Sequence, residues 1–246
     1  MSALPSPLPR SPFEGEGVRA VEAQSHVATM PLVDTLEEQE LLETMIDETK
    51  GPPLPSEYHY LIATPLLRYP PLPYGSRYGT RQESGIFYGS ENTETALAET
   101  AFYKLRFVDD SEGLTSLSMV MDVFAFAYRG EGTDTYGSAY DAVRVDLDSA
   151  SDYATSQRLG ARVREENLAI VRYRSARCPK GLANLAIFSL EALAPRPRRT
   201  TSWQLDLRDK RVFFMERNRF EGRRALAFTE AEFRENGSWA HPDAPG

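Results

Sequence analysis

The chain has 246 residues, of which 41% are hydrophobic, with a formal net charge of −8. This length and composition suffice for one buried core with an extension, and the negative charge argues against direct binding of nucleic acid. The single cysteine, Cys178, excludes an internal disulfide and a cysteine cage for a metal, and three histidines far apart in the sequence make a metal site or a histidine mechanism unexpected.

No apolar run approaches the roughly 20 residues of a membrane span, and the N-terminus lacks the basic start and apolar block of a secretory signal. The sequence therefore predicts a cytoplasmic protein without a membrane segment.

The first 57 residues are expected to lie outside the main domain. Residues 1–33 are rich in Pro, Ser, Gly and Glu without periodicity, which predicts a flexible arm. Residues 34–57 contain the capping-box pattern Thr35-Leu-Glu-Glu38 and predict an acidic helix over 34–50, followed by a proline-rich linker. The acidic side of this helix either faces solvent, which we favour, or docks a basic partner.

The main domain is expected over residues 58–233, with a loose tail over 234–246. Residues 61–67 predict a strand, and the prolines that follow predict an extended lead into a turn bounded by Gly75 and Gly79. Residues 86–88 then predict a short buried strand between glycines.

A helix is expected next, capped by Asn92 or Ser90, with Leu97, Ala101 and Leu105 on one face and Glu99 pointing toward the edge of that face. A second helix is expected from Asp148 or Ser149 to about residue 166. Alternating or apolar runs predict the remaining strands, over 116–128, 142–147, 170–173, 185–190, 203–207 and 212–215. Strands outnumber helices, and the helices interrupt them rather than alternate with them, so the fold class is α+β with a compact β-rich core.

Three aromatic or basic residues near the glycine-bounded turn are candidates for nucleotide binding. Arg77 lies among small neighbours, where backbone N–H groups can approach an anion and the guanidinium fork can bind phosphate in a bidentate manner. Tyr78 and Tyr88 can stack on a planar heterocycle. The alternatives are a surface arginine and core tyrosines, and for Tyr88 taken alone core packing is favoured.

Glu99 and Ser175 complete the candidate site. Glu99 is the only acidic residue among small apolar helix residues, and its carboxylate could stabilise the oxocarbenium-like state formed when a ribose–nicotinamide bond breaks. A solvated surface glutamate is the alternative, favoured if the residue is considered alone. Ser175 follows a strand and can donate a hydrogen bond to a ribose or carboxamide. Without a Gly-x-Ser-x-Gly elbow or a histidine base, it is not expected to be a nucleophile.

Four short motifs occur in the order seen in the RES-domain toxins, and from about residue 61 to 192 the chain resembles that family. The motifs are Gly75-Ser-Arg-Tyr78, Gly85-Ile-Phe-Tyr88, Thr95-Ala-Leu-Ala-Glu99 and Tyr173-Arg-Ser175. The resemblance implies a fold related to ADP-ribosyltransferases of the diphtheria-toxin type, NAD+ as substrate, no metal, and an antitoxin partner with a helix-turn-helix domain. It also implies that Arg77, Glu99 and Ser175 are catalytic and that Arg77, Tyr78, Tyr88 and Ser175 bind NAD+.

The chain carries some 60 residues before and about 40 after the RES-like core. This build is similar to family members that transfer ADP-ribose to a protein, a phosphoribosyl-pyrophosphate synthetase, whereas short members destroy NAD+. We expect transfer to a protein, with hydrolysis or phosphorolysis of NAD+ as the alternative. A non-enzymatic interaction module that uses the acidic helix is a second alternative, and it does not require Arg77, Glu99 and Ser175 to converge on one cleft.

Overall fold

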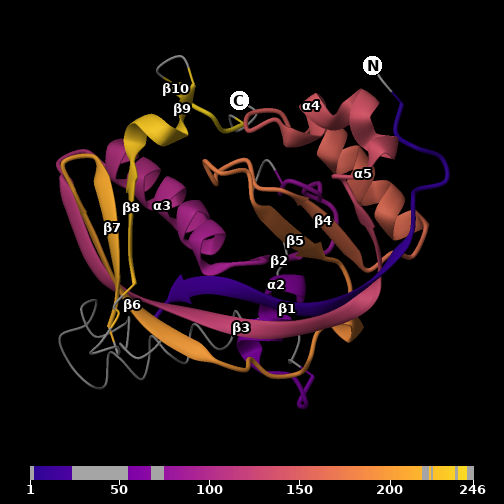
Figure 1. Cartoon of the computed structure of the whole chain (residues 1–246), viewed down its shortest axis with the longest axis horizontal. Coiled ribbons are helices and arrows are strands. Elements are labelled where there is room, and N and C mark those ends of the chain that lie inside the picture. Colours follow the sequence, from indigo (N-terminus) through magenta and orange to yellow (C-terminus); the bar gives the residue numbers. More distant parts are fainter. Residues whose placement is uncertain are drawn as a thin grey trace.

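The computed structural model describes residues 3–23, 55–67, 75–217, 222, 224–235 and 238–242. The acidic helix predicted over 34–50 lies outside the described residues. The described part is α+β, as predicted (Figure 1). Its strands are β1 (Ser11–Glu22), β2 (Phe87–Ser90), β3 (Ser116–Asp134), β4 (Ile170–Arg174), β5 (Ala183–Ile187), β6 (Thr200–Arg208), β7 (Arg211–Glu216), β8 (Ala225–Thr229), β9 (Arg234–Glu235) and β10 (Ser238–Trp239). Its helices are α2 (Tyr60–Leu67), α3 (Thr93–Asp110), α4 (Arg144–Asp148) and α5 (Ala154–Glu165), with 3-10 turns η2 (Ser138–Val143), η3 (Leu190–Ala192) and η4 (Glu230–Phe233).

The main sheet closes partly on itself. Its order is β1-β2-β5-β4-β3-β6-β7-β8, and β1 also pairs with β3, so that β1, β2, β5, β4 and β3 form a ring. The 19-residue β3 belongs to both parts, because it pairs with β1 and β4 in the ring and with β6 outside it. Strands β6, β7 and β8 continue from it as an antiparallel extension.

Three apolar clusters fill this framework. The first draws on all five strands of the ring and on α2, with Phe87, Phe126 and Leu185 among its members. The second packs α5 against β4 and β5, and the third packs α3 against β6 and β7. In Figure 1, α3 therefore lies beside the β6–β8 extension while α4 and α5 lie on the opposite side of the view. The helices are anchored to different parts of one sheet.

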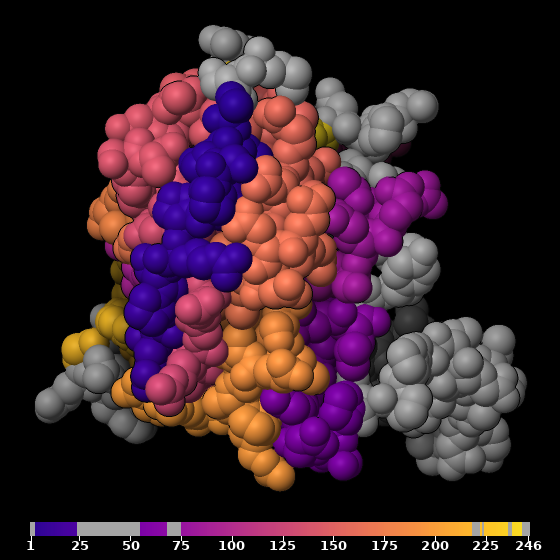
Figure 2. Space-filling view, turned by 90° about the vertical axis from the view of Figure 1, so that its right-hand side faces the viewer, coloured from indigo at the N-terminus to yellow at the C-terminus, as the bar shows by residue number. Residues whose placement is uncertain are grey.

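The prediction of a flexible arm over 1–33 is wrong for the residues that form β1. All 12 residues of β1 pair with β3, from Ser11 opposite Gly132 to Glu22 opposite Met121. Figure 2 shows these N-terminal residues lying flat on the body of the molecule. The alternation was hidden because Gly17 faces inward, directly opposite Phe126, where a Cβ would approach the ring to 2.5 Å. The small residue makes room for a large partner.

Two segments predicted as strands are helical. Residues 61–67 belong to α2, in which Ile62, Ala63 and Leu66 are buried, and residues 142–147 belong to η2 and α4, in which Val143 and Leu147 are buried. Buried positions three or four residues apart match a helix and not a strand. Short apolar runs leave this choice open in a sequence, and packing decides it.

Most other predicted elements are confirmed with shifted bounds. The predicted strands correspond to β2, β3, β4, β6 and β7, β5 begins and ends slightly earlier than expected, and β8 was missed. Asn92 caps α3, since its Oδ1 accepts a hydrogen bond from Thr95 N at 3.0 Å. The second predicted helix, α5, begins only at Ala154, because the Ser149 side chain accepts from the N–H groups of Ser151 and Asp152 and forms a turn instead.

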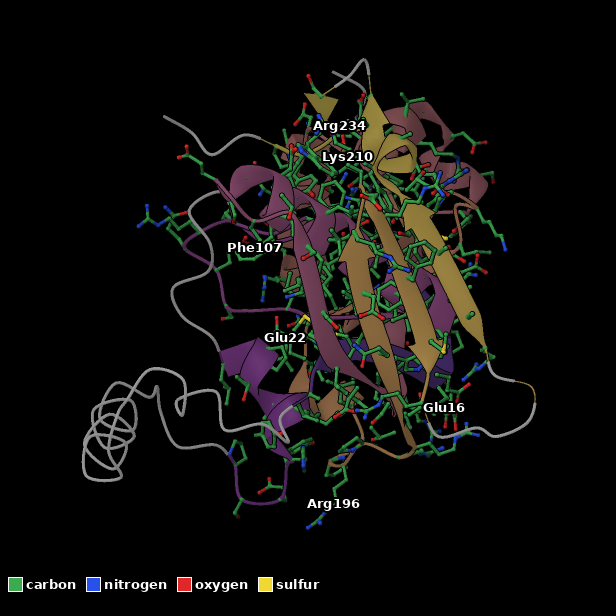
Figure 3. The ribbon with its side chains drawn as sticks, turned by 90° about the vertical axis from the view of Figure 1, so that its left-hand side faces the viewer. Glu16, Glu22, Phe107, Arg196, Lys210 and Arg234 are labelled. Atoms are coloured by element: carbon green, nitrogen blue, oxygen red, sulfur yellow. The ribbon has the colours of Figure 1, made fainter. Side chains whose placement is uncertain are left out.

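The tail predicted to be loose is packed in its described part. Strands β9 and β10 form a small hairpin, and the indole of Trp239 donates to Asp109 of α3 at 2.7 Å. His241 is buried and stacks on Phe102. Figure 3 shows Arg234 near Lys210, and both pair with Glu230. Aromatic residues near the C-terminus thus supply the apolar surface that a loose tail lacks.

Candidate active site

A cavity of about 630 Å³ lies where β1, β2, α3 and the turn around Arg77 meet the segments before α5 and after β4. Its volume is in the range of small-molecule sites. The lining includes the side chains of Arg77, Tyr88, Glu99, Tyr153 and Asn184, among other polar and aromatic ones.

The turn that carries Arg77 is fixed on both sides. Gly75 has a φ of 71°, and a Cβ there would lie 2.3 Å from Gly79 O, so the position requires glycine. On the other side α5 packs so closely that a Cβ on Gly160 would lie 1.8 Å from Tyr78 O. The helix also donates a hydrogen bond from Gln157 Nε2 to Ser76 O at 3.0 Å. Arg77 is therefore held by a rigid support.

Arg77 is a buried cation in the cavity wall, 9% exposed. Its two terminal nitrogens each donate to a backbone oxygen, of Leu147 and Ser149, at 2.9 Å, and its guanidinium lies 4.9 Å from the centre of the Tyr153 ring. Burial tends to lower the pKa of Arg77, but neighbours including Tyr153 and Glu99 outweigh it and the net shift is upward, so the group stays charged.

No carboxylate within the described ranges forms an ion pair with Arg77. Its two hydrogen bonds occupy two of the five N–H groups of a guanidinium. Glu99 is near enough to raise the pKa of Arg77 but does not pair with it, and a buried charge without a direct partner is costly. This arrangement suits an anionic ligand.

The Glu99 carboxylate is anchored through one oxygen. Ser175 Oγ donates to Glu99 Oε1 at 2.6 Å, and Asn184 Nδ2 donates to the same oxygen at 2.7 Å. Glu99 lines the cavity, and both of these hydrogen bonds leave its second oxygen, Oε2, unoccupied. The helix thus provides the carboxylate, and the sheet sets its orientation.

Ser175 lies behind this carboxylate. It is 3% exposed, is not part of the cavity wall, and accepts hydrogen bonds from the backbone N–H groups of Arg177 (3.2 Å) and Cys178 (3.0 Å). The structure therefore brings Ser175 to Glu99, a convergence that the non-enzymatic alternative does not require. The contact that it gives Ser175 is with the carboxylate, whereas a contact with ribose was expected.

The two predicted tyrosines differ. Tyr88 lines the cavity, and its hydroxyl donates to Ser76 Oγ at 2.9 Å and accepts from Tyr78 N at 3.0 Å. Burial raises the pKa of Tyr88 to about 12, so the phenol is neutral at physiological pH. Tyr78 is instead fully buried, and its ring packs edge-to-face with the Tyr173 ring, with the ring centroids 4.9 Å apart. Its place is in the core, which differs from the expected stacking on a substrate ring.

Sequence reasoning missed several residues of the wall, among them Asn184, Tyr153, Tyr173 and Arg177. Asn184 carried a signal, since it is the one polar residue in the apolar run of β5. Arg177 and Tyr173 each lie two residues from the candidate Ser175, and Tyr173 begins its motif, but neither residue was itself predicted to line a cavity. Tyr153 comes from a loop whose position depends on the packing of α5.

Within the stretches that the structure describes, no three His, Cys, Asp or Glu side chains are grouped so that they could hold a metal ion. In the same stretches, no helix has both the length and the apolar character needed to cross a membrane.

The fold and the cavity define a class of protein: an α+β domain in which an arginine and a glutamate line one ligand-sized cavity, and a serine from a distant part of the chain holds the glutamate from behind. The model of the RES domain matches residues 54–208, more than half of the chain, and the chain therefore belongs to the RES domain family. Strand β1 lies outside the matched residues although it lines the cavity.

Among solved structures, the chain is similar to one from the crystal structure of the M. tuberculosis MbcT–MbcA toxin–antitoxin complex. The identity is 10%, with 80% of this chain and 85% of that chain covered and a TM-score of 0.44. No curated protein matches the sequence.

Proposed function

We propose that the protein is a toxin of a toxin–antitoxin pair that binds NAD+ in the cavity and cleaves its nicotinamide–ribose bond. The observation that supports this most is that Arg77 and Glu99 line one cavity while Ser175, from a distant part of the chain, donates a hydrogen bond to Glu99 at 2.6 Å. Membership of the RES domain family supports NAD+ as the substrate.

The chemistry needs few groups. The bond between ribose and nicotinamide breaks with its electron pair going to the nicotinamide nitrogen, so the leaving group departs neutral and requires no general acid. Positive charge develops on the ribose, as in glycoside hydrolysis. Glu99 Oε2 stabilises this charge, and Arg77 binds the pyrophosphate of NAD+ or an adjoining ribose. Tyr88 packs against one of the two heterocyclic rings of NAD+. Ser175 is assigned to holding Glu99.

The proposal is tested by incubating the purified protein with NAD+ and measuring free nicotinamide. Release of nicotinamide is expected. If the protein releases no nicotinamide from NAD+, even when cell extract is added to supply an acceptor, the proposed reaction is refuted. The alternative function, a non-enzymatic interaction module, would then be favoured.

The acceptor proposed for the ADP-ribose is a cellular protein. The sequence on both sides of the RES core is similar in build to ParT, the toxin of the ParS–ParT pair, which modifies a phosphoribosyl-pyrophosphate synthetase. The alternative acceptors are water and phosphate. Labelled NAD+ in a cell extract separates these outcomes: a discrete labelled protein band supports transfer, whereas free ADP-ribose or its phosphate as the only product supports degradation of NAD+.

A separately encoded antitoxin, with a helix-turn-helix domain by family resemblance, is the proposed restraint in the cytoplasm. Arg77 is a buried cation in the cavity wall, and a segment bearing a carboxylate would compete with phosphate there. Expression of the chain alone should arrest growth of its host, and Glu99→Ala should relieve the arrest. In the purified complex, a bound antitoxin that leaves NAD+ turnover unchanged would refute the blocking mechanism.

A further inference from the structure

Asn184 connects the candidate catalytic carboxylate to the sheet. It is the second residue of the buried strand β5, and its Nδ2 donates to Glu99 Oε1 at 2.7 Å. Its Oδ1 accepts a hydrogen bond from Ser90 Oγ, also at 2.7 Å. Ser90 is the residue directly opposite Asn184 on β2. We infer that Asn184, supported by Ser90, is a positioning residue that holds Glu99 for cleavage of NAD+, an inference that rests on the proposed function.

The Glu99 carboxylate decides which end of the amide faces it, because an ionised carboxylate only accepts hydrogen bonds and an asparagine amide donates only from Nδ2. The Ser90 hydroxyl, which can donate or accept, then donates to Oδ1 and supports the amide from the opposite side. A buried amide in an apolar strand is costly unless its hydrogen bonds are made. Here both ends are used, and one of them serves Glu99.

Two donors on one oxygen restrict the carboxylate more than one would. The terminal torsion of glutamate is soft, so a single hydrogen bond leaves its plane free to turn. Ser175 follows β4 and Asn184 is in β5, and the two strands are paired at Tyr173 and Asn184. The carboxylate from α3 is therefore fixed through Oε1 by donors on or next to two neighbouring strands, which restricts the directions that Oε2 can take.

The kinetic test compares Asn184→Ala, Asn184→Asp and Ser90→Ala with the wild type. Ser202→Ala is the matched control, because Ser202 Oγ donates to Asp122 Oδ1 at 2.7 Å across another strand pair, outside the cavity wall. Loss of positioning is expected to lower kcat for nicotinamide release by about 10- to 100-fold in both Asn184 variants, and less in Ser90→Ala, with KM within about threefold. Ser202→Ala should match the wild type.

Wild-type kcat in both Asn184 variants would overturn the inference. A raised KM with unchanged kcat would also overturn it, since Asn184 would then bind substrate instead of positioning Glu99.

A second measurement does not depend on turnover. In a ¹H–¹⁵N spectrum of the whole protein, assigned with Asn184→Asp, one Nδ2 proton of Asn184 should be shifted downfield by the carboxylate. The chemical shift of this proton should move upfield in Glu99→Ala, and it should also change in Ser90→Ala. If neither variant moves it, the inference fails. A wild-type protein that releases no nicotinamide would refute the proposed function, and this spectrum would still decide whether Ser90 and Asn184 hold Glu99.

Discussion

Replacement of Ser175 by alanine should destabilise the fold as well as slow catalysis. The hydroxyl accepts from the backbone N–H groups of Arg177 and Cys178 and donates to Glu99 Oε1, all within a buried site. Alanine leaves two buried N–H donors without this acceptor, and each unsatisfied buried group costs about 1–3 kcal/mol. With partial relaxation of the turn we expect a loss of about 2–4 kcal/mol, which corresponds to a drop in Tm on the order of 10 °C for a chain of this size.

The assay is urea unfolding followed by circular dichroism, together with the rate of nicotinamide release. Ser189→Ala is the control, because the Ser189 hydroxyl accepts a single N–H group, of Glu191, at an exposed 3-10 turn, and its loss should cost about 1 kcal/mol or less. If Ser175→Ala keeps wild-type stability but loses activity, the serine acts on the substrate directly, as its motif first suggested, and its assignment to holding Glu99 is refuted.

Three further predictions concern the support of the site. Gly160→Ala should destabilise the protein by about 1–3 kcal/mol, because the added Cβ would meet Tyr78 O. Helix propensity alone predicts the opposite, a gain in stability of about 1 kcal/mol. A variant that is more stable than the wild type in urea unfolding would therefore contradict the close packing of α5. Deletion of residues 1–23 removes β1 from the ring and should abolish the cooperative unfolding transition, and a truncated protein with a wild-type melting curve would refute this. Burial raises the pKa of Tyr88 to about 12, so the folded protein holds the phenolic proton more tightly than the unfolded chain does. This contribution to stability is complete below about pH 10 and is lost as the pH rises through about 12. Thermal melts of Tyr88→Phe should show a flatter decline of Tm over this pH range, and an unchanged decline would contradict the prediction.

The motifs around Arg77, Glu99 and Ser175 could be found in the sequence because each is a local pattern. Their meeting depends on strand pairing, which local patterns do not contain. Asn184 illustrates the limit: an isolated amide in an apolar strand is visible as an anomaly, but its partners on β2 and α3 follow only from the register of β2 against β5 and from the packing of α3.

The errors in the fold have similar causes. The long alternation of β3 was sufficient to predict a strand, whereas β1 was missed because inward-facing Gly17 removes the apolar signal that defines a buried face. For Tyr78 and Tyr88, which lie near each other in the sequence, residue type could not decide which one faces the cavity. That choice depends on how the turn of Arg77 rests on α5, with Gly160 at the contact.

The central claim is that the Glu99 carboxylate drives cleavage of NAD+, and the rate of nicotinamide release by Glu99→Gln tests it most directly. Glutamine keeps the shape and removes the charge, so the rate should fall by about 100-fold or more. Glu94→Gln is the matched control, because Glu94 is on the same helix and pairs with Lys180, away from the cavity wall. It should release nicotinamide at nearly the wild-type rate. Release by Glu99→Gln at the wild-type rate would contradict the assignment of this carboxylate.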